Sequence, residues 1–293
     1  RVLVRRENGL DMRLVDMKKD MALIPRVAIH LNRETNNGVK YDPARDLVAL
    51  YAAGTGSGSF YREVARTADC APEDVVAGDL VLYNNQPGTV WGPEGEFVSA
   101  PRLDDLACVF ACTEGFLTAQ ERDMVPVLCV FDNEEIGSET KQGAASVFLP
   151  ETLAAISEAL GLSAADHRAL LADSMMLSCD NGHARHPNHP ELADTNEAPV
   201  PNGGVVVKHS PRYATDAVSA AAFQEICRRA QVPTQHYANR PDQMGGATLG
   251  NIADTKLPIP TVDIGMAQLA MHSCFETMGS RDVEAFVRAV RAC

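Results

Sequence analysis

Apolar runs of strand length alternate with segments of helical periodicity along the last two thirds of the chain, and this alternation constrains the fold most. The predicted strands are residues 125–131, 175–179, 205–208 and 261–265, and the predicted helices include 103–120, 151–160 and 214–230. Continuous apolar runs are typical of strands that are buried on both faces. The sequence therefore predicts an α/β fold, in which helices cover both faces of a sheet.

Residues 1–97 show a different pattern, with short strand-like pieces that are separated by turns. The pieces are residues 1–6, 80–83 and 89–91, and a stretch rich in glycine and serine lies at 54–59. We therefore predict a small β-rich domain over 1–97 and a larger α/β domain over 98–293. The chain opens on strand-like residues without an initiator methionine, so we expect its N-terminal part to be missing.

The composition excludes several classes of partner. Asp and Glu number 39 against 26 Lys and Arg, a net charge of -13. Nucleic-acid binding needs a basic surface, which this balance does not favour. The sequence also has no apolar run of the roughly 18 residues that a membrane-spanning helix needs. The eight cysteines form no C-x-x-C motif and several lie in apolar segments, so we expect reduced thiols and a cytoplasmic location.

Side chains that bind metals follow the predicted strands. Glu134 and Glu135 come after the strand at 125–131, Asp180 follows the strand at 175–179, and His272 follows the strand at 261–265. Asp104 lies at the start of the helix predicted for 103–120. Because chemistry in α/β sheets gathers at the carboxyl ends of strands, we expect these residues to meet. Mixed carboxylate and histidine ligands suit Zn²⁺, with Mn²⁺ or Co²⁺ as substitutes.

Each of these residues also has a purely structural explanation. A Glu-Glu pair is commonly a solvated strand end, and an Asp after a strand is commonly a turn or cap residue. The histidines that follow Asp180 at intervals of three suggest a self-contained zinc site. Pro187 and Pro190 interrupt the helix that such a site would need, so we do not predict one there.

Together the segments resemble the aspartyl aminopeptidase family of dizinc metallopeptidases, whose members assemble as dodecamers. The resemblance extends over nearly the whole chain, in the order of the family's motifs. The matching stretches are AIHLNR at 28–33, APRLDD at 100–105, DNEEIGS at 132–138, DNGHARHPN at 180–188, GGVVVK at 203–208, RYAT at 212–215, VDIG at 262–265 and AMHS at 270–273. The resemblance implies a zinc-peptidase mixed sheet in a catalytic domain, with the β-rich part serving for dimerisation.

The resemblance also implies a role for each candidate metal-site residue. Asp104 would bridge two zinc ions, Glu135 and His272 would complete the ligands of one ion, and Asp180 would bind the other. Glu134 would remain uncoordinated and act as general base and acid. A shared carboxylate suits two ions about 3.5–4 Å apart, and an uncoordinated one can take a proton from water. The implied reaction is the removal of N-terminal Asp or Glu residues from peptides.

The same resemblance implies a substrate pocket and an assembly. Lys208 would pair with the acidic side chain of the substrate, and His183 would line the same region. His30 would reach the active site of a neighbouring subunit, in dimers that build a tetrahedral dodecamer. The remaining residues assigned to the substrate site are Tyr213, Met244 and Gly245. We expect neither nucleic acid nor membrane as a partner.

Three departures from the family pattern leave alternatives open. An upstream His-Thr-Asp motif, which supplies the remaining ligand of the Asp180 metal, does not occur in this sequence. Asp105 stands where Asn is usual, and Ala247 stands where Ser is usual. One alternative is a dizinc aminopeptidase for neutral N-terminal residues. Another is a non-catalytic shell subunit that lacks one metal ligand.

Overall fold

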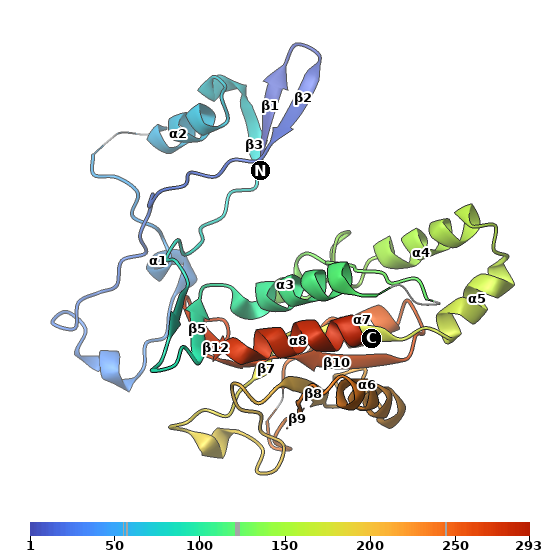
Figure 1. The fold of residues 1–293 in the computed structure, drawn as a ribbon. Helices are drawn as coiled ribbons and strands as arrows, with labels where there is room; N and C mark the ends of the chain where they lie inside the picture. Colours follow the sequence, from blue (N-terminus) through green and yellow to red (C-terminus); the bar gives the residue numbers. More distant parts are fainter. Residues whose placement is uncertain (55, 57, 121–123, 244) are drawn as a thin grey trace. The chain divides into compact units, whose positions relative to one another are not determined.

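The computed structural model describes residues 1–54, 56, 58–120, 124–243 and 245–293, which divide into two compact units (Figure 1). The first unit is Arg1–Asn85 and the second is Gln86–Cys293. The predicted boundary after residue 97 differs from this division. The reason is that β4 (Thr89–Trp91) pairs with β5 (Phe97–Ala100), which pairs with β12 (Glu276–Gly279) in the second unit.

The first unit is built on a small antiparallel sheet. Strand β1 (Val2–Arg6) lies between β2 (Gly9–Arg13) and β3 (Val75–Gly78). Val2 and Val4 of β1 pack with Val64 of α2 (Ser59–Thr67) in a small core. Shorter helical turns are η1 (Arg33–Asn37), α1 (Pro43–Asp46) and η2 (Pro72–Asp74).

The prediction of a strand at residues 80–83 is wrong. A strand forms a few residues earlier instead, as β3. Val81 and Leu82 are exposed, by 83% and 62%, and pair with no described strand. Apolar residues alone do not make a strand, because the backbone must also find a hydrogen-bonding neighbour.

The described part of the second unit holds a four-stranded and a five-stranded sheet. The four-stranded sheet has the order β6-β10-β8-β9, with β10 antiparallel to β8 and the two outer pairs parallel. The five-stranded sheet has the order β4-β5-β12-β11-β7. The bounds not yet given are β6 (Met176–Cys179), β7 (Gly182–His183), β8 (Val205–His209), β9 (Thr234–Ala238), β10 (Thr261–Gly265) and β11 (Ala267–Leu269).

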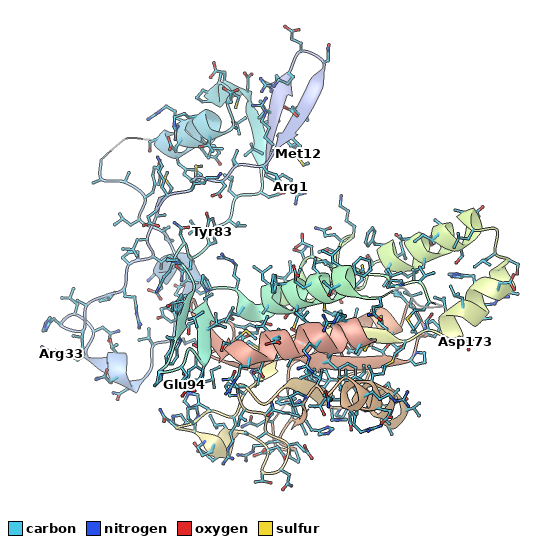
Figure 2. The ribbon with its side chains drawn as sticks, in the orientation of Figure 1. Arg1, Met12, Arg33, Tyr83, Glu94 and Asp173 are labelled. Atoms are coloured by element: carbon cyan, nitrogen blue, oxygen red, sulfur yellow. The ribbon has the colours of Figure 1, made fainter. Side chains whose placement is uncertain are left out.

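Helices cover both faces of the four-stranded sheet, which confirms the predicted α/β fold. Helices α3 (Leu103–Thr118), α6 (Ala217–Arg229) and α8 (Ser280–Ala292) share one core with Val205, Val207, Val262 and Ile264. The side chains of α3 and α8 meet where these helices lie side by side (Figure 2). Asp263 points to the opposite face, because successive strand residues alternate, and there it meets α7 (Gly250–Asp254).

The remaining described helices of the second unit are η3 (Glu134–Ile136), α4 (Phe148–Ala159), α5 (Ala164–Ala172) and η4 (Pro190–Leu192). Helix α5 begins with a reciprocal capping box between Ser163 and Asp166. Among the described residues, no helix combines the length and the apolar character that crossing a membrane requires.

The strand predicted for residues 125–131 is also wrong. The segment forms no regular strand, and Val125 and Val127 are exposed by 73% and 52%. Leu128 packs against the core, but no described strand pairs with the segment. Among the described residues this apolar run therefore has no strand to pair with, and it does not form a central strand of the sheet.

Candidate metal centre

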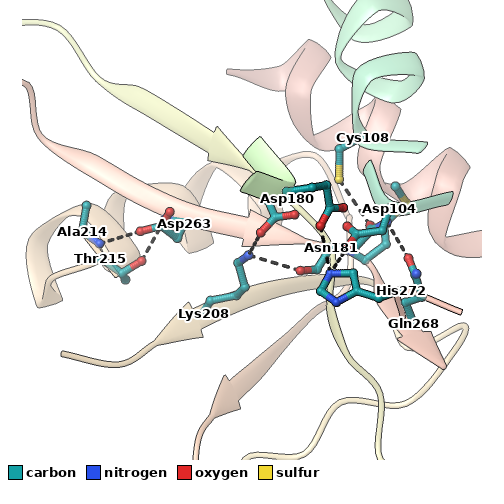
Figure 3. A network of polar contacts seen from close by, with 12 residues as sticks. Asp104, Cys108, Asp180, Asn181, Lys208, Ala214, Thr215, Asp263, Gln268 and His272 are labelled. Atoms are coloured by element: carbon teal, nitrogen blue, oxygen red, sulfur yellow. Dashed lines mark hydrogen bonds and ion pairs between the residues drawn. The ribbon is translucent and has the colours of Figure 1, made fainter. Parts of the chain in front are cut away.

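Segments that are distant in the sequence bring Asp104, Glu135, Asp180 and His272 together in the second unit. Asp104 lies at the start of α3, Asp180 directly follows β6, and His272 follows β11 (Figure 3). Glu135 lies in η3. The end of β10 comes so close that a Cβ atom on Gly265 would lie 2.0 Å from the carbonyl oxygen of Asp180. Only glycine permits this approach of the two backbones.

Asp104, Glu135 and His272 form one potential ligand group. Nε2 of His272 lies 3.3 Å from Oδ2 of Asp104 and 3.2 Å from Oε2 of Glu135. The potential ligand atoms of the three residues all lie within 4.8 Å of one another. Two carboxylates and one imidazole that converge in this way are a typical donor set for zinc.

Asp104, Asp105 and Asp180 form a second potential ligand group with the same spacing of their oxygens, within 4.8 Å. Asp104 belongs to both groups, which is the arrangement expected of a carboxylate shared between two cations. The peptide bond that joins Asp104 to Asp105 is cis. Asp105 was not among the residues predicted for the site, although its position beside Asp104 was the available signal.

The donor atoms themselves fit a bound cation. Oδ1 of Asp104 and Oδ1 of Asp105 are buried without a hydrogen-bond partner in the described structure. Buried polar atoms are rarely left unpaired in proteins, so unpaired carboxylate oxygens on two adjacent residues of the cluster indicate a site for an ion. The donors are oxygen and nitrogen atoms without thiolate, which suits zinc and, as substitutes, Mn²⁺ or Co²⁺.

The electrostatics of the cluster also favour a cation. Burial, and then the charges of Asp180, Glu135 and Glu276, raise the pKa of Asp104 to about 8. Burial and the charge of Asp180 raise the pKa of Asp105 well above its ordinary value. The two raised pKa values mean that ionising both carboxyl groups side by side is unfavourable. A divalent cation between them would favour the ionised forms.

Glu134 is half-buried beside the first ligand group. Burial, and then the charges of Asp180 and Glu135, raise its pKa to about 7. Glu134 and Glu135 lie in a 3-10 turn rather than at a strand end, and the residue before them, Asn133, has a left-handed backbone. Because successive residues of a 3-10 helix are about 120° apart around the axis, the two carboxylates diverge.

Lys208 is the cation that the chain itself supplies to the cluster. Its Nζ donates to Oδ2 of Asp180 at 3.0 Å and to the carbonyl of Asn181 at 3.3 Å. Burial alone lowers the pKa of Lys208, but the charge of Asp180 outweighs it and the net shift is upward. Burial alone raises the pKa of Asp180, but the charge of Lys208 and the hydrogen bond that Lys208 donates outweigh it, so the net shift is downward.

Aromatic rings surround the other side of Lys208. Its Nζ lies 5.2 Å from the ring centre of Tyr213, within the range of a cation–π contact. The ring centre of Tyr237 lies 6.5 Å from that of Tyr213 and 6.2 Å from that of His183. Lys208, Tyr213 and His183 therefore share one region beside Asp180, and their role in a substrate pocket stays a prediction.

Of the other predicted substrate residues, the structure describes Gly245 and His30. The carbonyl of Gly245 accepts a hydrogen bond from Arg212 at 3.2 Å, which ties its loop to the Tyr213 segment. Met244 lies outside the described residues. His30 is an exposed residue of a turn in the first unit.

Known proteins resemble this chain over most of its length. A family model described as Aminopeptidase I zinc metalloprotease (M18) matches residues 1–292. Probable M18 family aminopeptidase 2 of Mycobacterium leprae is 39% identical over 282 residues, which cover 96% of this chain and 66% of that protein. The protein of the same name from Clostridium acetobutylicum is 39% identical over 292 residues, or 96% of this chain and 67% of that one.

Solved structures give the same result for the fold. The crystal structure of prApe1 superposes with a TM-score of 0.91 at 28% identity, and the match covers 99% of this chain and 67% of that one. The mApe1 dodecamer of S. cerevisiae has a TM-score of 0.82 at 28% identity, over 99% of this chain and 66% of that one. The chain thus spans about two thirds of the length of the relatives it matches.

Proposed function

The chain belongs to the M18 family of zinc aminopeptidases, and from this premise we propose that it belongs to a cytoplasmic enzyme that removes N-terminal acidic residues from peptides with two zinc ions. The observation that carries the proposal is the position of Asp104 in two ligand groups at once. In the proposed site, Asp104, Glu135 and His272 hold one ion, and Asp104 and Asp180 hold the other.

Two zinc ions bound here would supply Lewis acidity, which polarises the scissile carbonyl and lowers the pKa of the attacking water. In this proposal Glu134 accepts the proton of that water on its carboxylate and later returns it to the leaving amine. In the metal-free site, burial and the charges of Asp180 and Glu135 raise the pKa of Glu134 to about 7, and bound cations would lower it from there.

The proposed preference for acidic residues rests on the charge around Lys208. An acidic side chain that enters between Tyr213 and His183 approaches a buried ammonium group, and Lys208 is only 1% exposed. A buried cation attracts a carboxylate more strongly than a solvated one does, because little water screens the pair.

One observation favours a second candidate, an aminopeptidase for neutral N-terminal residues. Lys208 already pairs with Asp180 at 3.0 Å, which satisfies part of its charge. The rings of Tyr213 and Tyr237 would then form an apolar wall for a neutral side chain.

For the assembly we propose a dodecamer, the form in which the structure of S. cerevisiae mApe1 was solved. In this arrangement His30 of one subunit would reach the site of its neighbour. A molecular mass in solution close to that of a single subunit would contradict the assembly and, with it, this role of His30.

The decisive test compares the hydrolysis of Asp-, Glu- and Leu-p-nitroanilide, with and without a zinc chelator. We expect hydrolysis of the two acidic substrates that the chelator abolishes. Glu134→Gln should lose at least about a hundredfold in kcat, the lower bound for a general base. Glu139→Gln is the matched control, because Glu139 is an exposed glutamate of the same loop.

The outcomes separate the candidates. A preference for the Leu substrate would replace the acidic specificity with the neutral one. Chelator-insensitive hydrolysis, or full activity in Glu134→Gln, would overturn the mechanism. No hydrolysis of any substrate by protein that carries zinc would favour a non-catalytic subunit.

A further inference from the structure

Glu276 links the backbones of two residues of the candidate metal centre. It lies on β12 and is only 2% exposed. Its Oε2 accepts a hydrogen bond from the backbone N–H of Asp104 at 3.0 Å, and its Oε1 accepts one from the backbone N–H of His272 at 2.7 Å. One carboxylate therefore holds two potential ligands of the same metal, which are far apart in the sequence.

Neither of these ligand segments is held by regular structure at this point. Arg102, before Asp104, is in the left-handed region at φ 59° and its own side chain does not cap α3, and the backbone of Asp104 is non-helical although it lies within the bounds of α3. His272 is itself left-handed, at φ 64°. A residue keeps such a conformation only where its surroundings enforce it, and such residues cluster at functional sites. For both segments a hydrogen bond to Glu276 supplies part of that enforcement.

Glu276 can act in this way because its own position is fixed. It pairs with Ala100 of β5 in an antiparallel ladder, inside the five-stranded sheet. Its charge also suits the N-terminus of α3, where a carboxylate satisfies an unpaired N–H and opposes the positive end of the helix dipole. The carboxylate of Glu276 is thus held in place and accepts hydrogen bonds from the backbone N–H groups of Asp104 and His272.

We propose that Glu276 is the positioning residue of the zinc ion that Asp104, Glu135 and His272 hold. This inference rests on the proposed zinc function and deepens it. By fixing the two backbones, Glu276 keeps Nε2 of His272 within 3.3 Å of Oδ2 of Asp104 and within 3.2 Å of Oε2 of Glu135. Residues that orient metal ligands commonly contribute about 10–100-fold to metal affinity.

The test replaces Glu276 with Gln, which has nearly the same shape. The amide keeps one acceptor oxygen but turns an NH₂ group toward the second backbone N–H, so one ligand segment loses its anchor. Zinc affinity is measured by competition with a chelator, and zinc content by elemental analysis after dialysis. We expect Glu276→Gln to bind the ion that Asp104 and His272 share about 10–100-fold more weakly, and the other ion, which shares only Asp104 with it, to be weakened less.

Asp282→Asn is the matched control. Asp282 is also a buried carboxylate with two backbone donors, Asn202 at 2.6 Å and Gly204 at 2.9 Å, and it contacts none of the candidate ligands. Its substitution removes the same kind of anchor elsewhere in the second unit. We expect it to lower the melting temperature without changing either zinc affinity.

Two further measurements keep the test independent of folding. Co²⁺ exchanged for zinc gives a visible spectrum that depends on coordination, and we expect Glu276→Gln to change it while Asp282→Asn does not. If Glu276→Gln does not fold, Glu276→Asp carries the test. It keeps the charge on a shorter arm that cannot reach both donors, and we expect the larger loss of affinity at the ion that His272 binds.

Normal affinity for both ions in the folded Glu276 variants would overturn the inference, and so would an equal loss in Asp282→Asn. If the unsubstituted protein binds no zinc at all, it is the proposed function that fails. The two failures are therefore distinguishable in one set of measurements.

Discussion

Lys208 and Asp180 form an ion pair of 3.0 Å in the interior of the second unit, where the side chain of Lys208 is 1% exposed and that of Asp180 is 15% exposed. Asp180 is at the same time a potential metal ligand. The ammonium group and a metal ion would thus neutralise the same carboxylate, and this makes the stability of the unit dependent on both.

We predict that Lys208→Met destabilises the metal-free protein by about 3 kcal/mol, because removing one partner leaves the other as an uncompensated buried charge. Added zinc should reduce this loss, since the ion neutralises Asp180 in place of Lys208. Denaturant unfolding with and without zinc measures both values. Lys256→Met, at an exposed lysine, is the control. Equal losses with and without zinc would contradict the shared neutralisation.

Zinc binding should release protons, and the release should depend on pH. The pKa of Asp104 is raised to about 8, so its carboxyl is mostly protonated at pH 6.5 without metal and mostly ionised at pH 8.5. Because zinc binds the ionised form, binding at pH 6.5 displaces this proton and binding at pH 8.5 largely does not. Calorimetric titrations in two buffers with different ionisation enthalpies count the protons. A release that does not fall between these pH values would contradict the assignment.

The rate should fall at acid pH because of Glu134. A general base must be ionised, and burial with the neighbouring charges raises its pKa to about 7 in the metal-free site. A bound cation lowers this pKa, so we predict that kcat/KM decreases as the pH falls through a value at or below 7. In Glu134→Gln the residual rate should not show this decrease at acid pH. An unchanged decrease in that variant would assign the titration to another group.

Asp282 should make the second unit more stable in mild acid. Burial raises its pKa to about 6, against an ordinary value of about 3.9. The folded state therefore holds this proton more tightly than the unfolded state. The resulting stabilisation is complete below about pH 4 and is lost as the pH rises through 6.

We therefore expect the free energy of unfolding of the native protein to gain roughly 2 kcal/mol over Asp282→Asn when the pH is lowered from 7 to 4. Other carboxyl groups titrate in this range, and taking the difference between the two proteins removes their contribution. A pH-independent difference would show that the Asp282 carboxyl stays ionised in the folded state.

Local pattern was sufficient to predict much of the fold. The runs at 175–179, 205–208 and 261–265 are the strands β6, β8 and β10, and the segment at 103–120 is α3. These predictions hold because a buried strand or helix face needs apolar residues at its own period. The strands expected at 80–83 and 125–131 did not form, because a strand also needs a neighbour that local pattern does not specify.

For the candidate site, the sequence by itself determined which residues have metal-binding chemistry, since their residue types beside the predicted strands and helices, together with the family resemblance, indicated Asp104, Glu135, Asp180 and His272. Only the tertiary structure decided their partners. Asp105 joins the second ligand group, Lys208 pairs with Asp180, and Glu276 anchors two ligands from a strand that the sequence did not predict. The physical reason is that ligand chemistry is a property of single side chains, whereas burial and hydrogen bonding arise from contacts between distant segments.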